Sequence, residues 1–218
     1  MNHLFSTEGP LMRALSDLTT LVVLNLLTLL CSIPVVTAGA ALCALNYCTM
    51  KMTEGEGHPA ATFWKEFKGN LKGATPVWLV FLAVAGGSWL YTYLFPIPED
   101  DVFFVMRVPV YLIAILFGML FVWIFPLMAR LENSFFAKFK NAAILAVLHL
   151  PRTIVMVFIY GVIGFLFRED LRLVPIAVVL GISLPAYLST LLYVPVIKEL
   201  IQRLTQQKDN GKENEEEN

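Results

Sequence analysis

The stretch of sequence that decides the fold runs from Leu18 to Met50 and reads LTTLVVLNLLTLLCSIPVVTAGAALCALNYCTM. It holds no charged side chain over thirty-three residues. As one straight helix it would be about 50 Å long at 1.5 Å per residue, whereas roughly twenty residues cross a bilayer core of about 30 Å. The stretch therefore has to be divided.

The segment from Ile33 to Gly39 is the natural place for that division. Pro34 disfavours a helical conformation at Ile33, and the side chain of Thr37 can cap a new helix that starts near Ala38. We expect two short helices, at about 11–33 and 38–52, joined by a tight re-entry. A single kinked span is the alternative.

The whole chain has the composition of a polytopic membrane protein. Of its 218 residues, 57% are hydrophobic and only 15% are charged, against about 25% charged in globular domains. Further apolar runs extend over 75–96, 102–129, 144–167 and 173–197. We therefore expect an all-α polytopic integral membrane helical bundle with six transmembrane helices, or five if the first pair is one span. Residues 1–205 form its single domain, and residues 206–218 form a polar, acidic tail that is expected to be disordered.

The positions of Lys and Arg predict the orientation. Bases gather in the connections 51–72 and 130–140 and in the tail beyond residue 198, whereas the connection at 99–101 holds three acids and no base. Because cytoplasmic connections are rich in Lys and Arg, these connections and the C-terminus are expected in the cytoplasm. Six helices would place the N-terminus there too, and five would place it outside. The net charge of −1 gives no attraction to nucleic acid.

The two base-rich connections are each expected to contain an interfacial helical segment. Over 60–73, Phe63 and Phe67 fall on one face of a helix and Lys68 falls on another, so this helix would lie along the inner membrane surface. The same spacing recurs later, which indicates either an internal duplication or the common preference of aromatic and basic residues for membrane interfaces. The candidate interface for a partner or for lipid consists of Phe63, Phe67, Lys68, Phe135, Phe139, Lys140, His149 and Arg152.

His149 and Arg152 interrupt the apolar stretch 142–167. If one span runs through this stretch, both side chains are buried in the membrane and need partners. If Pro151 starts a new helix, both lie near the cytoplasmic surface, where the helix start could bind an anion or a lipid headgroup.

Little in the sequence supports catalysis. None of the seventeen acids lies inside an apolar run, and neither HExxH nor GxSxG occurs. The three cysteines lie in apolar runs without a CxxC pair, which argues against both a disulfide and a zinc site. We expect no enzyme, and we assign no catalytic, cofactor-binding or metal-binding residue.

Polar uncharged residues inside the apolar runs allow two interpretations. Asn25, Thr28 and Ser32 form one stripe on the first expected helix, and Asn46 lies on the second. These four residues either hold the helices together by hydrogen bonds or line a polar path for a substrate.

Several segments together have a familiar pattern: Asn25, the re-entry Pro34-Val35-Val36-Thr37-Ala38-Gly39-Ala40-Ala41, the residues Phe63, Phe67 and Asn70, and the segment His149-Leu150-Pro151-Arg152-Thr153. With these segments the chain resembles, over about residues 5–205, the YesL-like family of bacterial membrane proteins, whose function is unknown. The resemblance implies a multi-pass protein of a Gram-positive cytoplasmic membrane, whose gene lies near those for carbohydrate ABC importers. The family has no assigned site residues to carry over.

Together these features predict an accessory or regulatory component of bacterial carbohydrate uptake that acts through protein contacts. The alternative is a stand-alone small-molecule transporter with a polar path through the bundle. The expected partners are the lipid bilayer, carbohydrate ABC importer subunits and further copies of the same chain. Neither a cofactor nor nucleic acid is expected.

Overall fold

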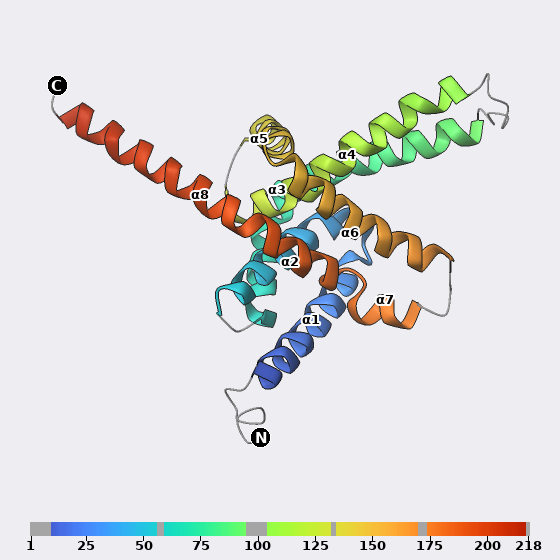
Figure 1. Cartoon of the computed structure of the whole chain (residues 1–218), viewed down its shortest axis with the longest axis horizontal. Helices are drawn as coiled ribbons and strands as arrows, with labels where there is room; N and C mark the ends of the chain where they lie inside the picture. The colour runs from blue at the N-terminus through green and yellow to red at the C-terminus, as the bar shows by residue number, and fades with distance from the viewer. Residues whose placement is uncertain (1–9, 56–58, 95–103, 132–133, 170–173, 217–218) are drawn as a thin grey trace.

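The computed structural model describes residues 10–55, 59–94, 104–131, 134–169 and 174–216 (Figure 1). Over these residues the regular structure is helical throughout, which confirms the all-α prediction. In chain order the helices are α1 (Pro10–Ser32), the 3₁₀ turn η1 (Val35–Thr37), α2 (Ala38–Thr53), α3 (Pro59–Leu94), α4 (Phe104–Arg130), α5 (Phe135–Leu148), α6 (Leu150–Glu169), α7 (Val174–Leu180) and α8 (Ser183–Glu216). The acidic connection at 99–101 lies outside the described residues.

Four of these helices are long and apolar enough to cross a membrane, within the described ranges. They are the segments 14–32, 60–94, 108–130 and 183–203. A fifth span results if α5 and α6, which are bent by 103° at their junction, are counted as one. The chain is thus a multi-pass membrane protein by the length and composition of its helices. The sixth expected span is not supported, because α2 has only 16 residues and is about 24 Å long.

The division of the stretch 18–50 occurs where the sequence places it. Helix α1 ends at Ser32 and α2 begins at Ala38. However, the hydroxyl of Thr37 does not cap α2. Its hydroxyl instead donates to the carbonyl oxygens of Cys31 (2.6 Å) and Pro34 (2.8 Å), since the last carbonyl groups of a helix have no partner within that helix.

Helix α2 is the centre of the bundle (Figure 1). One face, with Ala41 and Cys48, packs against Leu24 of α1, and the opposite face packs against α3 and α4. Gly39 permits the close approach of α3, since a Cβ atom at this position would lie 2.5 Å from Cβ of Trp78. The small residues of α2 therefore allow several neighbouring helices to surround it.

The expected interfacial helix over 60–73 is helical but not separate, because it is the first part of the continuous helix α3. Pro76 lies inside α3, and it removes only one backbone donor from a helix that its neighbours hold in place. Phe63 is completely buried against Leu24 and Leu45. The prediction that Phe63 faces lipid or a partner is therefore wrong: its ring fills a gap between helices of its own chain.

The two segments with the same spacing of Phe and Lys, Phe63-x-x-x-Phe67-Lys68 and Phe135-x-x-x-Phe139-Lys140, differ in structure. The first belongs to the 36-residue helix α3, whereas the second begins the 14-residue helix α5, which ends in a sharp bend. This difference gives no support to an internal duplication.

The C-terminal tail is part of the last helix. Helix α8 continues to Glu216 and extends away from the other helices (Figure 1). Residues 206–216 prolong this helix, which fits their content of Gln, Lys and Glu, all good helix formers.

Candidate functional site

Asn25 joins α1 to the break between α7 and α8. Its side-chain oxygen accepts hydrogen bonds from the backbone N–H groups of Ile182 and Ser183, both at 2.9 Å, and its amide donates to the carbonyl oxygen of Val178 at 2.7 Å. The first N–H groups of a helix have no partner within that helix, so Asn25 acts as a cap supplied from another helix. These bonds favour the helix-packing interpretation of Asn25.

The other three residues of the predicted polar path are not gathered around Asn25. Thr28 is buried and bonds within α1, to the carbonyl oxygen of Leu24 at 2.7 Å. Ser32 is half-buried at the end of α1. Asn46 lies on α2, where its amide donates to the carbonyl oxygen of Leu42 at 2.8 Å.

Asn46 belongs to a buried polar seam between α2 and α8. Its side-chain oxygen accepts a hydrogen bond of 2.9 Å from the hydroxyl of Tyr193, which lies 2.9 Å from the hydroxyl of Thr190. Thr190 in turn donates to the hydroxyl of Thr49 at 2.9 Å. Four polar side chains that would be costly in an apolar bundle thus satisfy one another.

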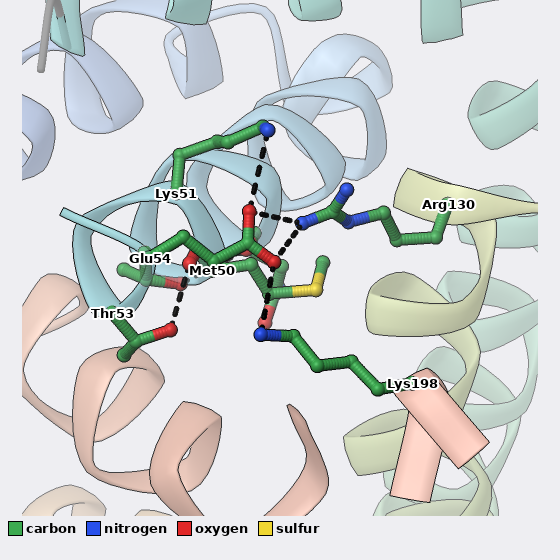
Figure 2. A network of polar contacts seen from close by, with 8 residues as sticks. Met50, Lys51, Thr53, Glu54, Arg130 and Lys198 are labelled. Atoms are coloured by element: carbon green, nitrogen blue, oxygen red, sulfur yellow. Dashed lines mark hydrogen bonds and ion pairs between the residues drawn. The ribbon is translucent and has the colours of Figure 1, made fainter. Parts of the chain in front are cut away.

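At the end of α2 lies a second polar group, in which three bases surround Glu54 (Figure 2). The backbone of Gly55, with a φ of +77°, follows α2 in the left-handed conformation that glycine adopts at helix ends, and Glu54 occupies the C-cap position. Arg130 Nη2 donates to both carboxylate oxygens at 3.0 Å. Lys51 Nζ lies 3.2 Å and Lys198 Nζ 3.4 Å from the carboxylate.

This group, the Glu54 cluster of Lys51, Glu54, Arg130 and Lys198, connects α2, α4 and α8. Partial burial raises the pKa of the Glu54 carboxyl, but the hydrogen bonds from the three bases outweigh it, so the pKa is lowered overall. The ring of Tyr47 lies beside the cluster, with its centroid 5.1 Å from the guanidinium carbon of Arg130, within the range of a cation–π contact. Glu54 is therefore ionised at neutral pH and ties three helices together.

The bend between α5 and α6 is the third polar group. Helix α5 ends at Leu148 and α6 begins at Leu150, which confirms that a new helix starts at the proline. The hydroxyl of Thr153 bonds to the carbonyl oxygen of Ala146 at 2.9 Å, and Trp123 Nε1 donates to that hydroxyl at 2.8 Å. His149 is half-buried.

The remaining candidate interface residues lie at or near the surface. Phe135 and the sequence neighbour Phe136 are exposed, and Phe136 is 82% accessible. Phe139 is partly buried and stacks on Phe81 of α3, with ring centroids 6.3 Å apart. Phe67 is also partly buried, whereas Lys68, Lys140 and Arg152 are exposed.

Sequence reasoning missed the Glu54 cluster and the partners of Asn46. The only signal in the sequence was that Arg130 and Lys198 each lie near the end of an apolar run, with Lys51 and Glu54 three residues apart. Nothing in these spacings shows that the residues meet, because their contacts join helices distant in the chain.

The described residues contain no cluster of His, Cys, Asp or Glu that could hold a metal ion. Two crevices, of about 510 and 350 Å³, open between α3 and α4. Their linings are mostly apolar and share Val84, Ser88 and Phe117. They could accept an apolar group but offer few polar atoms to orient a hydrophilic ligand.

Comparison with known protein families gives a match to part of the chain. Residues 21–92 match the profile of a family described as "Protein of unknown function, DUF624". The matched segment includes the re-entry, the central helix α2 and α3 almost to its end. Neither a curated protein nor a solved structure matches the chain.

Proposed function

We propose that this chain is an accessory or regulatory membrane protein that acts through protein contacts and serves bacterial carbohydrate uptake. In this proposal it lies in the cytoplasmic membrane of a Gram-positive bacterium, with its C-terminus in the cytoplasm, and belongs to the YesL-like proteins. The link to carbohydrate uptake rests on the resemblance of its sequence to that family.

The contact role is supported by the hydrogen bonds that polar side chains make between helices of the bundle. Asn25 caps α8, and Asn46 accepts a hydrogen bond from Tyr193, so two of the four side chains predicted for a polar path join helices. The stand-alone transporter is the second interpretation, but these bonds do not favour it.

Helix α5 offers the best supported contact surface. Because α5 and α6 are bent by 103°, α5 would lie roughly along the membrane surface if α6 crosses the membrane. Phe136 then projects from α5 with Lys140 on the same short helix, both exposed. Exposed aromatic residues beside bases are typical of membrane-surface and partner contacts.

Affinity purification of the tagged chain in mild detergent tests the proposal. We expect importer subunits to co-purify with the wild type and to be lost with Phe136→Ala. The matched control is Phe158→Ala, which removes another exposed ring, 68% accessible, from α6 and should leave the co-purification unchanged.

Two results would contradict the proposal. One is recovery of the wild-type chain alone. The other is uptake of a sugar by liposomes that contain only this protein, which would establish the transporter instead.

A further inference from the structure

We propose that Arg130 and Lys198 of the Glu54 cluster bind a phosphate group, supplied either by an anionic lipid headgroup or by a soluble phosphate compound. This inference is independent of the proposed role in carbohydrate uptake. It rests on the charge, the exposure and the remaining hydrogen-bond donors of these two side chains.

The first argument is charge. Among the described residues, Arg130, Lys198 and Lys51 share the single carboxylate of Glu54. Lys51 makes a further contact, so we leave its charge aside. Arg130 and Lys198 alone still exceed Glu54 by one positive charge, in a place where partial burial strengthens the attraction for an anion.

Donor geometry is the second argument. A guanidinium carries five N–H groups in a planar fork, and only Nη2 of Arg130 contacts Glu54. Figure 2 shows the other terminal nitrogen of Arg130 turned away from the carboxylate. The ring of Tyr47 lies beside the guanidinium of Arg130 and can hold it in place without using its N–H groups. The remaining N–H groups can then donate to a phosphate, whose oxygens match the planar arrangement of the guanidinium donors.

Access to the cluster is the third argument. The side chain of Lys198 is 55% exposed and that of Arg130 is 21% exposed, so an anion can reach both. Arg130 is the last residue of the candidate span 108–130, and Lys198 lies five residues before the end of the span 183–203. Bases near the ends of apolar spans lie at the level of lipid headgroups.

A purely structural role is the competing explanation, since Lys51 and Arg130 lie in the last turns of α2 and α4, where bases offset the helix dipole. The two explanations differ for Glu54. If Glu54 occupies part of an anion site, its removal strengthens phosphate binding. If the bases serve only the fold, phosphate has no specific effect in either protein.

The test measures the thermal shift of the purified full chain in neutral detergent. One series adds phosphatidylglycerol, with phosphatidylcholine as reference, and a second adds inorganic phosphate, with chloride at equal ionic strength as reference. We expect the wild type to be stabilised specifically in at least one series, as for any ligand that binds only the folded state. Stabilisation by the lipid alone identifies a headgroup, and stabilisation by inorganic phosphate identifies a soluble phosphate compound.

Variants decide whether the cluster is responsible. Lys198→Gln should reduce the shift by at least half, Lys198→Arg should retain it, and Lys65→Gln, which removes an exposed base from α3, should leave it unchanged. Glu54→Gln should lower the ligand concentration needed for half of the shift by several-fold. The proposal is overturned if neither ligand shifts the wild type, if Lys65→Gln acts like Lys198→Gln, or if folded Glu54→Gln gains no affinity.

Discussion

Replacing Asn25 by Ala tests the idea that a side chain of α1 holds the break between α7 and α8. The variant removes two acceptor contacts of 2.9 Å to the N–H groups of Ile182 and Ser183 and one donor contact of 2.7 Å to Val178. Asn25 is completely buried, so water does not readily replace these bonds.

The expected magnitude follows from these three bonds. An unsatisfied buried polar group costs about 1–3 kcal/mol, whereas hydrogen bonds between membrane helices contribute on average about 0.6 kcal/mol. Taking about 1 kcal/mol for each bond, we expect Asn25→Ala to lower the free energy of unfolding by about 3 kcal/mol. The local effect should be loss of the start of α8.

Reversible unfolding in mixed micelles with increasing sodium dodecyl sulfate measures this free energy. The matched control is Thr28→Val, because the hydroxyl of Thr28 bonds only within its own helix, and it should cost less than about 1 kcal/mol. If Asn25→Ala stays within about 0.5 kcal/mol of the wild type, a change too small for three lost bonds, the capping role of Asn25 is refuted.

Three further predictions concern the other contacts of the bundle. Because the pKa of Glu54 is lowered from its ordinary value of 4.5, its ion pairs stabilise the fold above that pH and are lost as the pH falls through the lowered pKa. The melting temperature of the wild type should therefore fall more steeply below pH 4.5 than that of Glu54→Gln. Parallel curves for the two proteins would contradict this prediction. Gly39→Ala should destabilise the protein by about 1–3 kcal/mol in the same micelle assay, since the new Cβ would meet Trp78 at 2.5 Å. The control Gly86→Ala, with open space around the new Cβ, should be neutral or stabilising. Equal effects of the two variants would show that α2 and α3 can move apart. Tyr193→Phe, which removes the 2.9 Å donor to the side-chain oxygen of a buried asparagine, should cost about 1–2 kcal/mol, and an unchanged unfolding midpoint would mean that this seam does not hold α2 to α8.

The sequence by itself predicted the features that depend on local chemistry. The apolar runs located the helical regions, Pro34 marked the end of α1 just before it, and Pro151 marked the bend before α6, whereas the run 173–197 is divided between α7 and α8. These predictions succeed because hydropathy and the geometry of proline act on a helix regardless of its neighbours. A prediction from local chemistry was wrong where a side chain expected to face solvent or lipid packs against another helix. Phe63 is the example, because its ring is buried within the bundle.

Only the tertiary structure decided which polar groups meet. Asn25 reaches the start of α8 and Glu54 reaches Arg130 and Lys198, yet no spacing in the sequence connects these residues. A polar side chain in an apolar helix must find a partner, but helix packing alone determines which partner lies within reach. The sequence therefore established that the chain is a helical membrane protein, and the packing around α2 established that Asn25 and Asn46 join helices and that three bases converge on the carboxylate of Glu54.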